Sequence, residues 1–300
     1  MSTDLNLVKI HLPRLVMSKL FPKIIRTLVT TALVAITSAT QAQQAPPTAP
    51  LPSSKTQTPA VVVPTTAPTK QDLKLLSKAA GIFWQTDRSE TESKMVFHGT
   101  NSGITIDSTI QIKTIAKTGG KFRSQITFIP LGSTAKASYI IVSNGADVWI
   151  HRPDRNVYTK TTVVAFERDQ FWIGISSFMF LRIDENMRQE LITSLGTDQD
   201  LIVNLNPPKP KDLQFTTRQA NGMNLSIYSF NIDKFKVDVF LPLENANLQK
   251  IEFSSKEPNL DLTFSETIIN RSSQVNITDR TFTFTPPKGT KKVKSIKIAL

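Results

Sequence analysis

Apolar and polar residues alternate with a period of two through most of the chain after residue 90. In the clearest run, Ile104, Ile106, Ile110 and Ile112 alternate with polar residues. Successive side chains of a β-strand point to opposite faces, so this run predicts a strand with one apolar and one hydrated face. Similar runs, separated by turn residues, predict about a dozen strands: 104–113, 121–129, 139–142, 148–150, 156–160, 201–205, 213–217, 225–230, 236–241, 248–254, 259–268 and 280–285.

Two glycine-containing turns join neighbouring strands of this series into hairpins. One is Gly119-Gly120 and the other is Ser143-Asn144-Gly145. Short turns of this kind connect antiparallel strands. A dozen amphipathic antiparallel strands exceed what a twisted open sheet tolerates without curling, so we expect a barrel or a half-barrel. Its interior needs an occupant, which is either a ligand or an apolar segment of the chain itself.

Two stretches depart from the period of two and predict helices. Thr69 and Asp72 have the spacing of a capping box, and the apolar residues after them share one helical face: Leu73, Leu76, Ala80 and Phe83. The stretch 163–195 contains the most apolar part of the chain, and Asp184 and Gly196 are placed to begin and end a second short helix there. The prediction is therefore a mainly β fold with α insertions.

The N-terminal 42 residues have the order of a secretory signal peptide. Basic residues precede an apolar run at 28–39 that is too short to span a membrane, and we expect cleavage after Ala42. The long segment before this pattern suggests that translation begins at Met17. Residues 43–69 are rich in Pro and Thr without apolar periodicity and predict an unpacked linker, which leaves residues 70–300 as the folded domain.

The chain contains no cysteine, which excludes disulfides, thiolate metal sites and a lipid-modified N-terminal cysteine. We therefore expect the exported protein to be soluble in the periplasm. Residues 43–300 hold 31 Lys and Arg against 23 Asp and Glu, a net charge of +8. Five lysines lie within the last thirteen residues, and they suit either weak attraction to an anionic membrane surface or a solvated, frayed tail. Export removes nucleic acid from the expected partners.

Residue types that usually carry catalysis or bind metals are sparse and scattered. Outside the N-terminal region the histidines are His98 and His151, which lack ligand spacing. The sequence has no nucleophile elbow, phosphate-binding loop or metalloprotease motif. We therefore expect no enzyme activity, no metal and no cofactor.

Two motifs resemble those of the LolA family of periplasmic lipoprotein carriers. The first is YIIVSNGADVWI at 139–150, followed by Pro153, and the second is FTFTPPKG at 282–289. The opening helix, the GKFR strand at 120–123, the helical insertion and the LQKIEF strand at 248–253 follow the family's order, so the resemblance covers about residues 70–295. It implies an incomplete antiparallel β-barrel, a half-barrel, covered by a helical lid, with an apolar cavity for the acyl chains of lipoproteins.

The resemblance also implies partners in the bacterial envelope. A carrier of this family receives lipoproteins from release machinery at the inner membrane and delivers them to an acceptor at the outer membrane; another envelope lipid is an alternative cargo. We expect a monomeric carrier that touches the membrane surface transiently. The alternative is a binding module of the same fold that senses lipids or lipoproteins without transporting them. An enzyme acting on envelope lipid is the least favoured class.

Ten apolar residues form the candidate lipid-binding set. Six lie in predicted strands and are assigned to the cavity wall: Phe122, Ile126, Phe128, Trp149, Leu262 and Phe264. Four lie in the helical insertion and are assigned to the lid: Phe171, Trp172, Phe178 and Phe180. Alternating apolar residues also form the ordinary core of β-proteins, so each residue alone fits a core position better, and the hypothesis concerns the set.

Overall fold

The structure is a computed structural model that describes residues 66–101, 104–130, 136–183, 185–194, 213–220, 222–232, 235–257 and 260–298. The predicted signal peptide, nearly all of the predicted linker and the predicted strand 201–205 lie outside the described residues. Across the described ranges, no helix combines the length and the apolar character that crossing a membrane requires.

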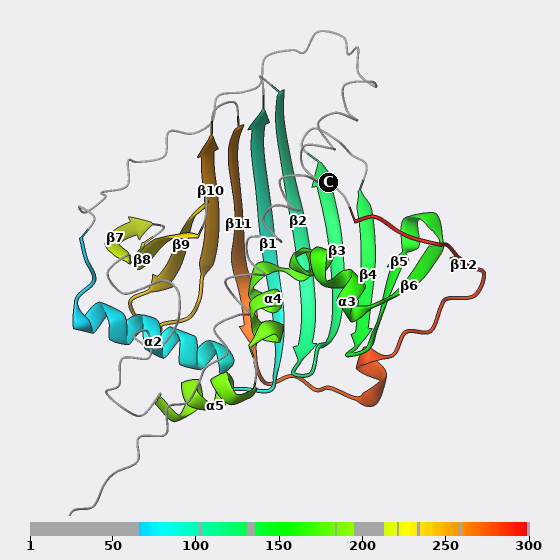
Figure 1. The fold of residues 1–300 in the computed structure, drawn as a ribbon, viewed down its shortest axis with the longest axis horizontal. Coiled ribbons are helices and arrows are strands. Elements are labelled where there is room, and N and C mark those ends of the chain that lie inside the picture. Colours follow the sequence, from blue (N-terminus) through cyan, green and yellow to red (C-terminus); the bar gives the residue numbers. More distant parts are fainter. Residues whose placement is uncertain are drawn as a thin grey trace, which may run out of the picture.

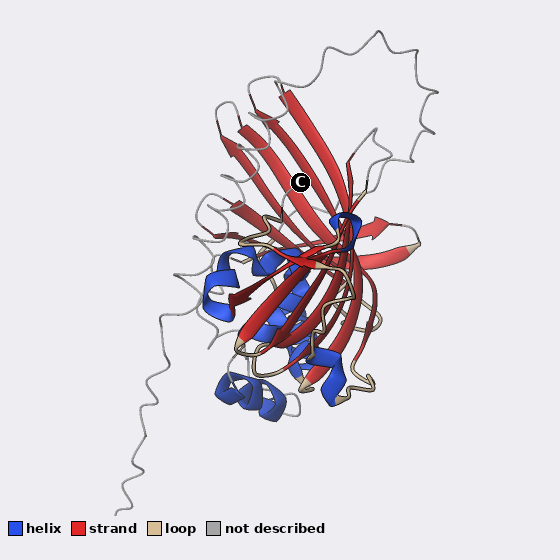
Figure 2. Ribbon diagram, turned by 90° about the vertical axis from the view of Figure 1, so that its right-hand side faces the viewer, coloured by secondary structure: helices blue, strands red, loops and turns tan. Residues whose placement is uncertain are grey.

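The described strands form one twelve-stranded sheet in the order β12-β6-β5-β4-β3-β2-β1-β11-β10-β9-β8-β7 (Figure 1). Its strands are β1 (Arg88–Asn101), β2 (Ile104–Lys117), β3 (Lys121–Pro130), β4 (Ala137–Asn144), β5 (Asp147–Arg152), β6 (Val157–Thr162), β7 (Gln214–Ala220), β8 (Met223–Ile232), β9 (Phe235–Pro242), β10 (Lys250–Glu257), β11 (Leu260–Ser272) and β12 (Lys291–Lys292). Figure 2 shows the sheet curving around the helices, and β7 and β12 remain unjoined edges. The predicted incomplete barrel is confirmed.

Strand β1 joins the two halves of the sheet, because it pairs antiparallel with both β2 and β11. The sequence pattern did not predict β1 as a strand. The inward-facing positions at its start are Ser89, Thr91 and Ser93, each 1% exposed. These small polar side chains hide the apolar alternation, which begins only at Met95 and Phe97.

The two predicted hairpin turns are present, and they pack against each other. The Asn144 side chain accepts hydrogen bonds from the backbone N–H groups of Ala146, at 2.9 Å, and Asp147, at 2.8 Å. Gly145 has a φ of 96°, and a Cβ atom there would lie 2.5 Å from the carbonyl oxygen of Gly119. Ser143 Oγ donates to the carbonyl oxygen of Gly120 at 2.8 Å. The Ser-Asn-Gly sequence therefore serves the contact between turns as well as the turn itself.

The helices lie on the concave face of the sheet (Figures 1 and 2). Helix α2 (Lys70–Trp84) begins at the predicted capping box, in which Thr69 and Asp72 exchange hydrogen bonds. Helix α5 (Glu185–Ser194) confirms the second predicted helix, whose predicted ends at Asp184 and Gly196 lie outside the described residues. The apolar insertion before α5 folds into α3 (Val163–Phe166), a 3-10 helix (Glu167–Ile173) and α4 (Ile175–Arg182).

The C-terminal segment differs from the prediction. The predicted strand 280–285 is wrong, because Thr278 and Thr281 form a capping box that begins a 3-10 helix, Asp279–Phe282. Irregular chain follows and leads into the prolines at 286 and 287, which lack the N–H groups of a strand. Strand β12 then pairs with β6 in parallel, a correction to the expected antiparallel arrangement. Ile298 is 4% exposed within the core. The frayed-tail alternative is therefore wrong, because the segment crosses the edge of β6 and returns to the interior.

Candidate functional site

Inward-facing side chains of the strands from β5 to β9 form one continuous apolar surface. Alternate residues of each strand contribute to it, as the period of two requires. Its members are each at most 4% exposed and include Ile150, Ile141, Phe122, Ile126, Phe128, Ile110, Met95, Phe97, Leu262, Phe264, Phe253 and Val237. The concave face therefore offers an apolar surface that extends across both halves of the sheet.

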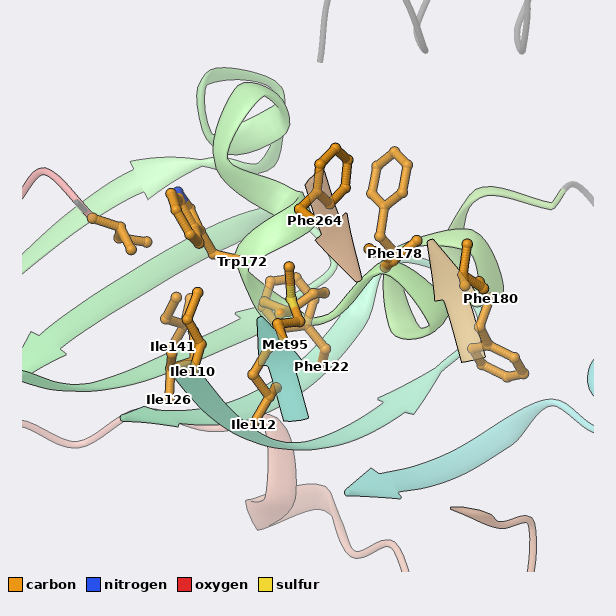
Figure 3. Close-up of a cluster of buried hydrophobic side chains, with 14 of the residues drawn as sticks. Met95, Ile110, Ile112, Phe122, Ile126, Ile141, Trp172, Phe178, Phe180 and Phe264 are labelled. Carbon is orange, nitrogen blue, oxygen red and sulfur yellow. The ribbon is translucent and has the colours of Figure 1, made fainter. Parts of the chain in front are cut away.

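Aromatic side chains of the helical insertion cover this surface (Figure 3). The Trp172 ring meets the Phe128 ring edge to face, with centroids 5.2 Å apart. Phe178 and Phe180 of α4 are 5% and 0% exposed, and Trp172 is 2% exposed. The insertion thus closes the open sheet with large apolar groups that no strand of the sheet supplies.

Eight of the ten predicted site residues belong to this one cluster: Phe122, Ile126, Phe128, Trp172, Phe178, Phe180, Leu262 and Phe264. Phe171 lies in the 3-10 helix Glu167–Ile173, and its side chain lies outside the described part of the structure. Trp149 is on the opposite face, where its ring stacks on Phe284 with centroids 6.3 Å apart. The structure therefore does not bring Trp149 together with the others. A role in binding lipid remains a prediction for the set.

A buried carboxylate that the sequence analysis did not single out lies beneath α4. Glu266 is 1% exposed, and it follows Leu262 and Phe264 on the inward side of β11. Its carboxylate accepts hydrogen bonds from the backbone N–H of Ser176 at 2.6 Å and from Ser176 Oγ at 3.0 Å. Burial raises the pKa of this carboxyl group above its ordinary value. The inward register of β11 was the signal that could have revealed it.

The residue before α4 is shaped to this carboxylate. Gly174 has a φ of 98°, and a Cβ atom there would lie 2.7 Å from Glu266 Oε1. Only glycine combines that backbone conformation with so close an approach.

Two arginines lie at the other end of α4. Arg188 of α5 is 2% exposed and donates from Nη2 to the carbonyl oxygen of Phe180 at 3.3 Å. Arg271 donates to Thr91 Oγ1 and to the carbonyl oxygen of Phe83, each at 3.0 Å. The guanidinium groups of Arg188 and Arg271 lie 4.7 and 5.2 Å from the centre of the Phe180 ring. Burial lowers the pKa of Arg271 to about 10, which leaves it charged at neutral pH.

The polar groups on the convex face form local pairs. His98 pairs with Asp107 across the β1–β2 hairpin. His151 is 6% exposed beside Phe284, and burial lowers its pKa. Across the described ranges, no three His, Asp or Glu side chains gather as a metal site would require.

Fold and site together define an open half-barrel whose apolar concave face is closed by helices. No protein-family model matches the chain, and no curated protein matches it.

Three solved structures illustrate what this chain is similar to. A putative outer membrane lipoprotein-sorting protein domain from Vibrio parahaemolyticus is 11% identical with a TM-score of 0.31, over 71% of this chain and 97% of that one. LprF from Mycobacterium bovis is 11% identical with a TM-score of 0.36, over 72% and 100%. A LolA superfamily protein from Nitrosomonas europaea is 12% identical with a TM-score of 0.28, over 73% and 99%. At these identities and TM-scores the likeness carries no functional argument.

Proposed function

We propose that this chain is an exported carrier that holds the acyl chains of lipoproteins, or of another envelope lipid, against the concave face of its sheet. The observation that carries the proposal is the covering of the apolar surface. An open sheet is closed by Trp172, Phe178 and Phe180 from a short helical segment, and not by further strands. The hydrogen bonds between this segment and the sheet run to side chains of the strands, such as Thr114 and Glu266, so the segment can be displaced without breaking the strand-to-strand hydrogen bonds of the sheet.

Burial of the covering aromatic side chains in the empty state and burial of an acyl chain in the loaded state release free energies of similar size. Burying about 14 methylenes of one acyl chain at about 0.8 kcal/mol each yields roughly 11 kcal/mol. Burial of the three aromatic side chains of the insertion yields about 5–9 kcal/mol, at about 1.5–3 kcal/mol each. Exchange of one for the other is therefore nearly balanced, so loading and release turn on modest differences between donor and acceptor membranes.

The proposed site of action is the periplasm, between release machinery at the inner membrane and an acceptor at the outer membrane. The signal-peptide pattern supports export, and intact-mass analysis of the periplasmic fraction should find a chain that begins at or near Gln43. A membrane-bound chain that keeps residues 17–42 would contradict this part of the proposal.

The C-terminal lysines support transient contact with membrane surfaces. Lys291 and Lys292 are exposed on β12, and Lys288, Lys294 and Lys297 are exposed beside it. Because β12 is paired with β6, these charges are held along one edge of the sheet. Anionic lipid headgroups attract such a row of lysines.

The test is binding of a diacylated lipopeptide by the purified full chain, with the same peptide lacking its acyl chains as the control. Organic extracts of the freshly purified protein, analysed by mass spectrometry, would identify the native cargo. We expect saturable binding of the lipopeptide alone and transfer of it to acceptor vesicles. Binding without transfer would assign the chain to the sensing class, and the absence of binding would contradict the proposal.

A further inference from the structure

Helix α4 is held over the sheet by hydrogen bonds to buried ionisable side chains at its two ends. At its start, the Glu266 carboxylate accepts from the N–H of Ser176 at 2.6 Å and from Ser176 Oγ at 3.0 Å. Near its end, Arg188 donates to the carbonyl oxygen of Phe180 at 3.3 Å. An acceptor at the start of a helix and a donor at its end both satisfy backbone groups that the helix itself leaves unpaired. The two contacts therefore act on the same element from opposite ends.

We propose that Glu266 is the positioning residue that fastens α4 over the concave face, so that α4 leaves the sheet when the bonds between Glu266 and Ser176 break. This inference rests on the proposed function, because it assigns a residue to the closing of the carrier. Glu266 bonds directly to Ser176 in the first turn of α4. It acts through the position of Phe178 and Phe180.

A fastening by a buried ionisable group suits an element that must open. Exposing apolar groups to water costs free energy, whereas a buried carboxylate that is exposed regains its hydration. The lifting of α4 would expose both Glu266 and Ser176 to solvent. The same contacts that define the closed position therefore make opening less costly than it would be for an entirely apolar seam.

The surroundings of Glu266 set the sign of a pH effect. Its neighbours across the sheet are Met95 of β1 and Ile251 of β10, which carry no charge. The charged groups on the same side of the sheet are Arg271 on its own strand and, beyond Phe180, Arg188 of α5. Burial raises the pKa of Glu266 and outweighs the hydrogen bonds from Ser176 and the charge of Arg271, which favour the carboxylate. The closed form therefore binds the Glu266 proton more tightly than the open form, in which the carboxyl group is hydrated.

The stability of the closed form relative to the open form therefore falls as the pH rises. The closed form is favoured most below the ordinary Glu pKa of 4.5. Its advantage declines as the pH rises from there through the raised pKa of the buried group. Opening of α4 should become easier with rising pH, by about tenfold for each unit by which burial raises that pKa.

The experiment is hydrogen exchange of the α4 amides in the lipid-free full chain, corrected for the intrinsic pH dependence of exchange. Glu266→Ala removes the acceptor, and we expect the amides of α4 to exchange about ten- to a hundredfold faster than in the wild type. Glu266→Gln keeps an acceptor without a titrating charge. It should largely restore protection and abolish the pH dependence. Glu252→Gln, on the convex side of the neighbouring strand β10, is the matched control and should change neither.

Two outcomes would overturn the inference. One is unchanged protection of α4 in Glu266→Ala. The other is an equal loss of protection in α4 and in β3 to β5, which would make Glu266 a general core residue. Lipopeptide binding by the same variants separates this inference from the proposed function. If the lipopeptide binds but Glu266→Ala leaves the exchange of the α4 amides unchanged, only the role of Glu266 is rejected. If Glu266→Ala changes this exchange but no variant and no wild-type chain binds lipopeptide, the carrier function is rejected.

Discussion

Replacement of Gly174 by alanine should destabilise the protein through two separate effects. The residue has φ 98° and ψ 137°, a conformation that costs a residue with a Cβ atom about 1–3 kcal/mol. The new methyl group would also lie 2.7 Å from Glu266 Oε1. The carboxylate must then move away from Ser176, and a lost hydrogen bond to a charged group costs about 1.5–3 kcal/mol. We therefore expect Gly174→Ala to lower the free energy of unfolding by about 3–5 kcal/mol.

Gly222→Ala is the matched control for this prediction. Gly222 also has a positive φ, 76°, but a Cβ atom there meets no other atom within 4 Å. It should therefore show only the backbone cost, about 1 kcal/mol. Urea denaturation followed by circular dichroism measures both free energies of unfolding, provided that the m-values agree. Equal destabilisation by the two substitutions would refute the claim that the Glu266 carboxylate is packed against the start of α4.

Two further predictions concern the C-terminal segment. Lys→Glu changes at Lys291, Lys292 and Lys294 should weaken association with anionic vesicles at low salt by at least tenfold, because each lysine near the surface contributes about 1 kcal/mol. Co-sedimentation with vesicles measures this association. Unchanged sedimentation would leave the lysines without a role at membranes. Ile298→Ala should cost about 2–4 kcal/mol because the side chain is 4% exposed, whereas Lys297→Ala, which is exposed, should cost under about 0.5 kcal/mol in thermal unfolding. Similar melting temperatures for these two variants would show that the C-terminal segment does not contribute to the core.

Most of the fold could be predicted from the sequence because its strands are amphipathic. A period of two identifies both the strand and its inward face, and the capping box at Thr69 marks the start of α2. The pattern fails where the inward face is not apolar. In β1, small polar side chains lie inward, and in the neighbouring β2 the hydroxyl of Thr114 donates to the carbonyl oxygen of Ile173 in the covering segment at 2.8 Å. Such a partner comes from a distant part of the chain and leaves no local pattern.

The candidate site shows the same division. The period of two placed Phe122, Ile126 and Phe128 on one face, as the structure has them. It could not place Trp149, because the residues on both sides of it are apolar too and either face of β5 was open to it. Glu266 lay on the inward register of a predicted strand, but its partner Ser176 is 90 residues away in sequence. The alternation pattern therefore does show an ionisable residue at an inward position. A search for apolar residues alone does not find it.

The carrier hypothesis is tested most directly by a variant in which Trp172 is the single tryptophan, with Trp84→Phe and Trp149→Phe. Trp172 is 2% exposed in the closed structure, so its emission without lipid should be that of a buried indole. Titration with a diacylated lipopeptide that carries bromine on its acyl chains should quench and shift this emission in a saturable way, because the chains replace the ring against Phe128. The same peptide without acyl chains should have no effect. Unchanged Trp172 emission while the lipopeptide binds, or no binding at all, would contradict the account and make the covering segment part of a permanent core.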